Sequence, residues 1–382
     1  MKVLQICAAY KPAFIYGGPT MSVSMLCEQL VNENISIEVF TTTANGKSEL
    51  DVIPNRQTTV DDVPVTYFKR TTKDHTHLSP SLIKTVWKEA PDFDLVHIHA
   101  WWNLVSIFSC LVALMRKVPV LISARGTLSP YSFRNKNISV KWFIHRQLGK
   151  RLLNRCHVLA TSTREARAIA EVAHPKSITI LPNFVKLPKQ AIYAKNKPGE
   201  YFRLLFFSRI EEKKGLDILL DALIDVSVPY HLDIAGDGDK SYVADLKMIA
   251  AGNNIQHKIS WLGFQNENKF DLMHQHDLLV LPSYDENFGN VVIESLSVGT
   301  PVLISEEVGL ADYVQSNRLG WLCQSTPASV ASMINSIAVN QKDELRRIRS
   351  DAPAIIYHDF NKENLIKRYI NMYDKLINHD SL

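Results

Sequence analysis

The stretch LLVLPSYDENFGNVVIESLSV, residues 278–298, joins two apolar segments through a short polar turn. Its first part, LLVLPS, is typical of a strand buried on both faces of a parallel sheet, and VVIESLSV has the character of a helix. The turn between them holds Glu286 and Gly289, and Glu294 follows eight residues after Glu286. The stretch therefore predicts a strand, a loop and a helix of an α/β domain, with two carboxylates near the start of the helix.

The same alternation of strand and helix runs through both halves of the chain. Before the central stretch lie RLLFFSR, YHLDIAG and ISWLGF as strands, and the first half offers VLQIC, IEVFTT, DLVHIH, VPVLISAR and CHVLATS. Helical segments separate most of these strands, which is the pattern of a doubly wound α/β domain. The pattern stops at residues 181–200, where prolines and polar residues predict a linker.

We therefore expect an α/β protein of two Rossmann-like, doubly wound domains that face each other across a cleft. The first domain is expected at residues 1–185 and the second at residues 186–362. A final amphipathic segment, residues 363–382, is predicted to form a helix that packs back on the first domain. In such sheets ligands bind at the carboxyl ends of the strands, so functional residues should follow strands.

Length and composition indicate the number of domains and the cellular compartment. A length of 382 residues suits two domains, and the five cysteines are odd in number and far apart in the sequence. This pattern favours a reducing compartment and argues against a disulfide framework or a zinc site. The apolar start is too short for a signal peptide, and residues 101–115 are shorter than the about 20 residues of a membrane-spanning helix. We expect a cytoplasmic location.

Charge is distributed unevenly between the two halves. Residues 1–185 hold 22 lysines and arginines against 13 acidic residues, whereas residues 186–382 hold 21 against 26. Residues 95–164 contain eleven basic residues and no acidic one. This asymmetry favours an anionic partner, for which nucleic acid, a membrane surface and a phosphorylated substrate all qualify.

The segment RNKNISVKWFIHRQLGKRLLNR, residues 134–155, interleaves seven basic residues with apolar ones. It is predicted to form an amphipathic helix, either an ordinary surface helix or one that docks on anionic lipid headgroups. In the second case each basic residue near the membrane contributes about 1 kcal/mol. The candidate membrane-facing residues are Lys141, Arg146, Lys150 and Arg151.

A second loop of interest is SRIEEKKGLD, residues 208–217, between a predicted strand and a helix that starts near Leu216 or Asp217. Arg209 and Lys214 stand just before the helix. A diphosphate at a helix N-terminus is bound by free backbone N–H groups and the helix dipole, and basic side chains add to this attraction. A solvated loop of charges around a helix cap is the alternative.

The two glutamates of the central stretch suit a hydroxyl-rich ligand, because carboxylates accept pairs of hydrogen bonds from sugar or ribose. Gly289 permits close approach of the backbone, and Asn287 or Asn290 is predicted to cap the helix. Either glutamate alone fits an exposed residue equally well. Both together, around such a turn, favour a binding site.

Taken in order, the motifs resemble retaining family 4 glycosyltransferases of the GT-B fold, of the bacterial surface-polysaccharide type. The resemblance covers nearly the whole chain, and although each motif is weak alone, the ordered set is highly specific. In the second half it rests on Arg209 with Lys214-Gly215, DIAGDG at 233–238, WLG at 261–263, Glu286 and Glu294 with Phe288-Gly289, and GTPV at 299–302. In the first half it rests on Gly17-Gly18, DLVHIH at 94–99, SARGTLSP at 123–130 and LPNFV at 181–185.

The resemblance implies a role for each motif. Arg209 and Lys214 would bind the donor diphosphate, Glu286 would contact the transferred sugar, and these three are the expected catalytic residues. Glu294 would hold the ribose. The remaining donor-binding residues would be Gly17, Gly18, Gly263, Phe264, Phe288, Gly289 and Asn290.

The first domain departs from the family at one position. Where many relatives carry a histidine that contacts the donor sugar or the acceptor, this chain has Arg125, and either Arg125 or His99 is expected to take that place. No protein nucleophile is expected, because enzymes of this type are thought to transfer the sugar on its front face. No cofactor and no metal are expected, since fixed positive charge would ease departure of the phosphate.

The leading hypothesis is a retaining, metal-independent hexosyltransferase. It would move a sugar from a UDP- or GDP-sugar to a hydroxyl of a glycan acceptor, one linked to a polyprenyl diphosphate in O-antigen, capsule or exopolysaccharide synthesis. Such an enzyme would lie on the inner face of the cytoplasmic membrane. A nucleotide-sugar epimerase on the same fold is the alternative. Nucleic-acid binding is disfavoured because it leaves the two glutamates unexplained.

Overall fold

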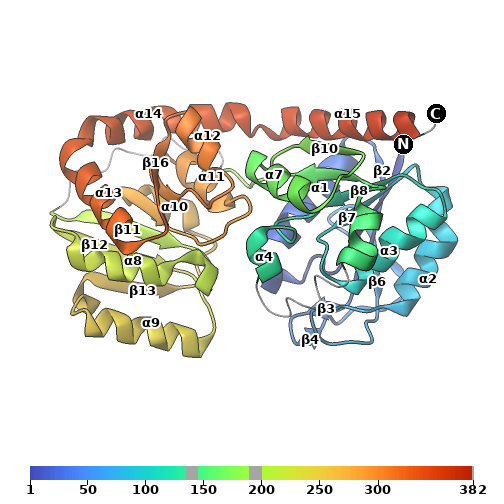
Figure 1. Cartoon of the computed structure of the whole chain (residues 1–382), viewed down its shortest axis with the longest axis horizontal. Coiled ribbons are helices and arrows are strands. Elements are labelled where there is room, and N and C mark those ends of the chain that lie inside the picture. Colours follow the sequence, from blue (N-terminus) through green and yellow to red (C-terminus); the bar gives the residue numbers. More distant parts are fainter. Residues whose placement is uncertain (135–144, 189–199, 381–382) are drawn as a thin grey trace. The chain divides into compact units, whose positions relative to one another are not determined.

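The computed structural model describes residues 1–134, 145–188 and 200–380. The chain divides into two compact units, one of residues 1–184 with 362–382 and one of residues 185–361. Each unit is an α/β layer structure around its own mostly parallel sheet, as the sequence predicted (Figure 1).

The sheet of the first unit has eight strands in the order β10-β9-β8-β7-β1-β2-β6-β5. All neighbours are parallel except β5 and β6. Helices cover both faces of the strands, which explains their continuous apolar character. The strands are β1 Lys2–Cys7, β2 Ser36–Thr42, β5 Gln57–Val60, β6 Val63–Phe68, β7 Leu95–His99, β8 Val120–Ser123, β9 His157–Ala160 and β10 Ser177–Ile180.

Successive residues of these strands alternate between two cores. Leu4 faces the core beneath α2 and α3, whereas Val3 faces the core beneath α1. The helix α15 Lys362–Asp380 adds Tyr369 and Tyr373 to this second core, so the last part of the chain completes the first unit (Figure 1). The other helices are α1 Gly18–Asn32, α2 Pro80–Glu89, α3 Leu104–Met115, α4 Pro130–Arg134, the π-helix η3 His145–Gly149, α6 Lys150–Leu153 and α7 Thr163–Val172.

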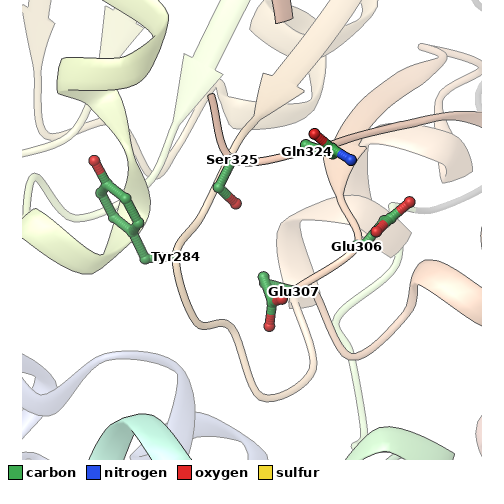
Figure 2. Close-up of a pocket in the computed structure, with 5 residues that line it drawn as sticks. All are labelled: Tyr284, Glu306, Glu307, Gln324 and Ser325. Atoms are coloured by element: carbon green, nitrogen blue, oxygen red, sulfur yellow. The ribbon is translucent and has the colours of Figure 1, made fainter. Parts of the chain in front are cut away.

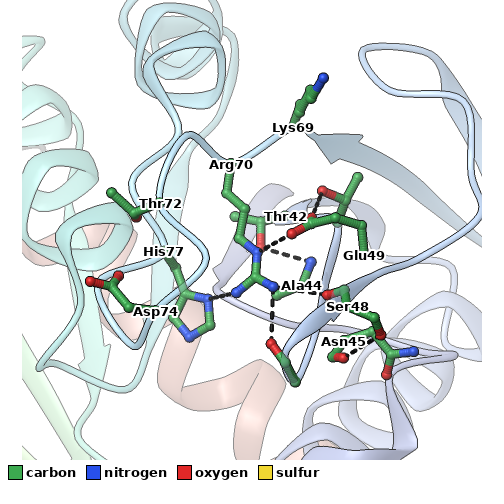
Figure 3. Close-up of polar contacts among 12 residues, drawn as sticks. Thr42, Ala44, Asn45, Ser48, Glu49, Lys69, Arg70, Thr72, Asp74 and His77 are labelled. Carbon is green, nitrogen blue, oxygen red and sulfur yellow. Dashed lines mark hydrogen bonds and ion pairs between the residues drawn. The ribbon is translucent and has the colours of Figure 1, made fainter.

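A small hairpin, β3 Ala44–Asn45 with β4 Ser48–Glu49, follows β2 and is held by a buried arginine (Figure 3). The Arg70 guanidinium donates to the Glu49 carboxylate at 2.7 Å and to the carbonyl oxygens of Gly46 and Ser48 at 3.0 and 2.9 Å. His77 lies 3.3 Å from the same guanidinium, and burial together with that charge lowers the pKa of His77 to about 4. This cluster was not predicted from the sequence.

The second unit has six parallel strands in the order β13-β12-β11-β14-β15-β16. From β11 the chain adds strands in one direction, and it returns through β14 to add strands on the other side. The strands are β11 Phe202–Phe207, β12 Tyr230–Ala235, β13 Ile259–Gly263, β14 Leu278–Leu281, β15 Val302–Ser305 and β16 Gly320–Cys323. The helices are α8 Leu216–Ala222, α9 Lys240–Gly252, α10 Lys269–His274, α11 Asn290–Ser297, α12 Ala311–Ser316, α13 Pro327–Asn340 and α14 Lys342–Asp359.

One pair of cysteines is closer than sequence spacing suggested. Cys110 and Cys156 are far apart in the sequence, yet their sulfur atoms lie 3.5 Å apart in the core of the first unit as free thiols. Of the predicted amphipathic helix at residues 134–155, residues 135–144 lie outside the described residues, Arg134 ends α4, and residues 145–153 form η3 and α6. Within the described residues, no helix is both long and apolar enough to cross a membrane.

Candidate functional site

The candidate site of the second unit lies at the junction of β11 and β14, where the order of the strands reverses. Parallel sheets open a crevice at such a point, because the loops after the two central strands leave in opposite directions. The loop after β11 carries Arg209 and Lys214, and the loop after β14 carries Glu286. Residues separated by more than seventy positions are therefore brought to one edge of the sheet.

Hydrogen bonds connect the loop after β11 to the loop after β14. The backbone N–H of Tyr284 donates to the Lys213 carbonyl at 2.9 Å, and the Tyr284 hydroxyl donates to Asp217 at 2.8 Å. Gly215 adopts φ +70°, and a Cβ atom there would lie 2.2 Å from the Pro282 carbonyl oxygen. Only glycine fits this close approach without displacing backbone. The α8 helix starts directly afterwards at Leu216, as the sequence predicted.

Lys214 and Glu286 form an ion pair across these loops, and both side chains are largely buried. Burial alone would raise the pKa of Glu286. The charge and hydrogen bond of Lys214, together with the charges of Lys213 and Arg209, outweigh burial and hold that pKa below its ordinary value. Glu286 is therefore a carboxylate at neutral pH.

Arg209 is placed differently from Lys214. Its side chain is 48 % exposed and forms an ion pair of 2.9 Å with Glu211 of the same loop. Exposed pairs of this kind are weak, so the Arg209 guanidinium can leave Glu211 for an anionic ligand at low cost.

Glu294 lies one turn inside α11 and has a different cationic partner, Lys269 of α10, at 2.7 Å. Both side chains are about 15 % exposed. Burial raises the pKa of Glu294, and the nearby charges of Lys269 and Lys186 counter this only in part. The two glutamates that the sequence pairs in one motif thus sit in separate ion pairs with opposite pKa shifts.

The start of α11 corrects one prediction. Gly289 is the N-cap residue with φ +92°, and as a glycine it has no side chain with which to cap the helix. The prediction that Asn290 caps α11 was wrong, because the left-handed Gly289 is the N-cap residue and Asn290 is already the first helical residue; Asn287 lies two residues before the N-cap. The first turn of α11 consequently lacks the cap that the side chain of an N-cap residue supplies in other helices.

The remaining donor-side candidates of the second unit fall into two groups. Gly263, with φ +65°, ends β13, and the phenyl ring of Phe264 beside it is 71 % exposed. The Phe288 side chain is buried against Phe360 instead, with ring centroids 6.3 Å apart, so only its backbone is open to a ligand role.

Sequence reasoning missed a pocket beside this site (Figure 2). It has a volume of about 280 Å³ and is lined by residues that follow β14, β15 and β16: Tyr284, Glu306, Glu307, Gln324 and Ser325. The Glu307 carbonyl accepts from the Glu286 N–H at 3.1 Å, so the pocket adjoins the ion pair. The strand-end rule that singled out Glu286 applies equally to Glu306 and Glu307, which directly follow β15.

In the first unit, Gly17 has φ +65° and precedes α1, whose first residue is Gly18. His99 at the end of β7 is 2 % exposed, and Arg125 follows β8 with a hydrogen bond of 3.3 Å from its Nε to the His99 ring.

Of the candidate membrane-facing residues, Arg146, Lys150 and Arg151 are exposed, whereas Lys141 lies outside the described residues. Among the described residues no group of three or more possible metal ligands comes together.

The chain belongs to the family 4, or group 1, glycosyltransferases, a retaining family with the GT-B fold. The family model described as "Glycosyltransferase Family 4" matches residues 16–188, and the model described as "Glycosyl transferases group 1" matches residues 189–353. The two models together span both α/β units. This assignment favours a transferase over the epimerase and nucleic-acid hypotheses.

Individual relatives are distant. An uncharacterised glycosyltransferase of Methanocaldococcus jannaschii is 29 % identical over 44 % of this chain and 44 % of its own length, so the chain spans less than half of that relative. A GDP-mannose:cellobiosyl-diphosphopolyprenol alpha-mannosyltransferase of Xanthomonas oryzae pv. oryzae is 24 % identical over 80 % of this chain and 78 % of its own. The crystal structure of Anabaena HepE in complex with UDP and glucose has a TM-score of 0.74 at 20 % identity, covering 98 % of this chain and 100 % of that one. This last likeness supports the fold.

Proposed function

We propose that the protein transfers a sugar from a UDP- or GDP-sugar to a hydroxyl of a glycan acceptor with retention of the anomeric configuration. The observation that carries the proposal is the Lys214–Glu286 ion pair at the junction of β11 and β14. It sets a cation for a diphosphate beside a carboxylate for sugar hydroxyls, in a chain of the transferase family.

In this proposal Lys214 and Arg209 bind the donor diphosphate and neutralise the charge that develops as it departs. The sugar–phosphate bond breaks with its electron pair going to the diphosphate. The acceptor oxygen attacks the same face of the sugar, and its proton passes to the departing phosphate oxygen. When Lys214 turns to the phosphate, the Glu286 carboxylate is released to accept hydrogen bonds from the sugar. No metal and no protein nucleophile are needed.

The other contacts follow from the chemistry of the groups. The backbone N–H groups of Phe288, Gly289 and Asn290, at the start of α11, suit a phosphate or sugar oxygen. Glu294, held by Lys269, suits the ribose hydroxyls.

The nucleobase and the sugar complete the set of donor contacts. Gly263 and the exposed Phe264 suit the flat face of the nucleobase. Gly17 and Gly18 would let the backbone of the first unit approach the diphosphate. Tyr284, Glu306, Glu307, Gln324 and Ser325 extend the hydroxyl-binding surface.

We further propose that the acceptor is linked to a lipid diphosphate in surface-polysaccharide synthesis. The mannosyltransferase relative is named for a diphosphopolyprenol substrate. Arg146, Lys150 and Arg151 are exposed on one short helical segment, in a region of the chain rich in basic residues, and would dock the first unit on anionic lipid. In this proposal the enzyme works on the cytoplasmic face of the membrane.

A screen of nucleoside-diphosphate binding, followed by an assay of sugar transfer, tests the proposal. Purified protein should show a raised melting temperature with one nucleoside diphosphate among UDP, GDP, ADP and CDP, because ligand binds only the native state. The matching nucleotide sugar should then be consumed by the wild type, with and without EDTA. Lys214→Ala and Glu294→Ala should each lose at least about a hundredfold in kcat/KM, equivalent to about 2.7 kcal/mol.

Arg56→Ala is the matched control, since Arg56 is an exposed cation of the first unit. If no nucleotide raises the melting temperature, the donor proposal fails. If Lys214→Ala transfers sugar at the wild-type rate, the site is assigned wrongly. Loss of transfer in EDTA that a divalent ion restores would contradict the metal-free mechanism.

A further inference from the structure

Lys269 and Glu294 form a largely buried ion pair between α10 and α11 of the second unit. The Lys269 ammonium lies 2.7 Å from Oε1 of Glu294, and the two side chains are 15 % and 14 % exposed. Because Lys269 is the first residue of α10, the dipole of its own helix disfavours a cation there. Glu294 and the ring of Phe270, whose centroid lies 4.9 Å from the ammonium, offset this effect. The position of Lys269 is therefore set by its contact with α11.

The ion pair leaves hydrogen-bonding groups free on both partners. Across the parts of the chain that the structure describes, Oε1 of Glu294 accepts from Lys269, whereas Oε2 has no hydrogen-bond partner. Within the same parts, Nζ of Lys269 donates only to Glu294 and keeps two of its three N–H donors. A free acceptor and free donors thus lie side by side.

This combination matches the two adjacent hydroxyls of a ribose. A hydroxyl donates and accepts, so it can donate to the carboxylate and accept from the ammonium at the same time. Hydrogen bonds to charged groups are stronger than those between neutral groups. A 2′-deoxyribose has one hydroxyl fewer and would leave a group of the largely buried pair without a partner, which is unfavourable.

The order of residues along the chain agrees with a nucleoside bound at this pair. Gly263 ends β13 and the exposed Phe264 follows it, and the proposed function assigns both to the nucleobase. The same loop leads into α10, which Lys269 begins. Because the nucleobase and the ribose are covalently joined, their binding residues must lie close together, and a single short loop supplies residues for both.

We propose that Lys269 and Glu294 together recognise the ribose of the donor nucleotide and make the site selective for ribonucleotides over 2′-deoxyribonucleotides. The inference rests on the proposed function, in which Glu294 binds the ribose hydroxyls. Lys269 contributes in two ways. It contacts a hydroxyl directly, and it keeps Glu294 in the charged form that accepts hydrogen bonds.

The charge of Lys269 matters because Glu294 is buried. Burial raises the pKa of Glu294, and the charge and hydrogen bond of Lys269, with the charge of the exposed Lys186, counter this only in part. Loss of Lys269 should therefore raise the pKa of Glu294 further and leave part of it protonated near neutral pH. A protonated carboxyl group accepts hydrogen bonds from hydroxyls less strongly than a carboxylate.

Two other titratable or charged groups on the helices that pack against α11 have partners of their own. Nδ1 of His274 on α10 lies 3.0 Å from the Val298 carbonyl oxygen. Arg349 of α14 forms an ion pair of 3.7 Å with Asp277. The charge of Glu294 is therefore governed by burial and by the two lysines.

Isothermal titration with UDP, GDP and their 2′-deoxy forms tests the selectivity. The wild type should bind the ribonucleotide at least about tenfold more tightly than its 2′-deoxy form, because the latter loses a hydrogen bond to a charged group. Lys269→Met should reduce this ratio to less than about threefold at neutral pH, whereas Lys269→Arg should keep most of it. Lys258→Met is the matched control, since Lys258 also lies over an aromatic ring, that of Tyr230 at 4.7 Å, but directly before β13 at the opposite end of the strand.

The pH dependence of the same ratio separates recognition of the ribose from packing. Ionisation of the diphosphate affects both nucleotides and cancels in the ratio. In Lys269→Met the ratio should rise between about pH 6 and pH 8 as Glu294 loses its proton, and in Lys269→Met/Glu294→Gln it should not change with pH. A lysine with only a structural role would weaken both nucleotides alike when replaced, and the ratio would stay at its wild-type value.

The outcomes distinguish this inference from the proposed function. If the wild type binds UDP or GDP and Lys269→Met keeps the wild-type ratio, the inference is overturned and the proposed function stands. If the wild type binds neither nucleotide, the proposed function fails and the inference fails with it.

A second variant covers the case in which Lys269→Met does not fold. Lys269→Met/Glu294→Leu removes both charges of the pair, and replacement of a buried ion pair by apolar residues is often neutral for stability. This variant should bind the ribonucleotide and its 2′-deoxy form with equal affinity. A remaining preference of about tenfold for the ribonucleotide would overturn the inference.

Discussion

At the scale of single residues, Glu286 and Glu294 show what spacing can and cannot predict. Both were expected near the start of one helix, and both lie there. Their protonation could not be predicted, because it depends on cations from other parts of the chain: Lys214 for Glu286 and Lys269 for Glu294. Lys214 was expected as a phosphate ligand, and no sequence signal showed that it pairs with Glu286 within the folded chain.

The opposite pKa shifts predict opposite contributions to stability. The folded-state pKa of Glu286 lies below the ordinary value of 4.5, so its stabilisation is present above about pH 4.5 and is lost as pH falls through the folded value. The folded-state pKa of Glu294 lies above 4.5, so its contribution is full below about pH 4.5 and is lost as pH rises through the raised value.

Urea unfolding at several pH values measures both effects. Relative to the wild type, Glu286→Gln should lose free energy of unfolding at neutral pH and converge with the wild type under acid. For Glu294→Gln, the difference from the wild type should change with pH in the opposite sense. Identical pH profiles for the two variants would contradict the shifts that burial and the lysines impose.

At the scale of elements, the strands and helices of both units were predicted from apolar segments and from the glycines, prolines and polar residues that separate them. The loops were less predictable, because their conformation depends on contacts between segments distant in sequence. Gly215 illustrates this. It was chosen for its place before a helix, but what requires glycine is the Pro282 carbonyl of the neighbouring loop. The pocket at Glu306 and Glu307 and the cluster around Arg70 were missed for the same reason.

Gly215→Ala should therefore destabilise the protein and disturb the candidate site. A Cβ atom at φ +70° and 2.2 Å from a backbone oxygen should cost at least about 2 kcal/mol in the free energy of unfolding. Gly252→Ala is the control, because a Cβ atom there meets nothing within 4 Å and the residue ends α9. That variant should be neutral or gain up to about 1 kcal/mol. Equal stability of the two variants would show that the loop at Gly215 adapts.

At the scale of the whole molecule, composition predicted two α/β domains and an excess of basic residues in the first half. The sheet order and the family bear out the fold. The surface that the basic residues serve stays a prediction, since it depends on a partner. It is open to a direct test because Lys150 and Arg151 are exposed on α6 while Leu152 and Leu153 are buried beneath them.

The double variant Lys150→Glu/Arg151→Glu should bind vesicles that contain phosphatidylglycerol at least about tenfold more weakly than the wild type, because each basic residue near the surface is worth about 1 kcal/mol. Sedimentation with vesicles measures the bound fraction. Lys342→Glu/Arg346→Glu, an equal change of charge at exposed positions of α14 in the other unit, is the control. Equal loss of binding in the two double variants would reduce the effect to net charge alone.

The return of α15 to the first unit has a consequence for how the protein is made. Residues 1–184 leave the ribosome before any of residues 185–361, yet the apolar face that Leu365, Tyr369 and Tyr373 cover waits until α15 has been translated. Until then the nascent first half exposes apolar residues of its core, and exposed apolar surface of this kind is bound by chaperones. The second unit, continuous in the chain, is complete before the first. Although synthesis proceeds from the N-terminus, the unit that begins the chain is the last to close.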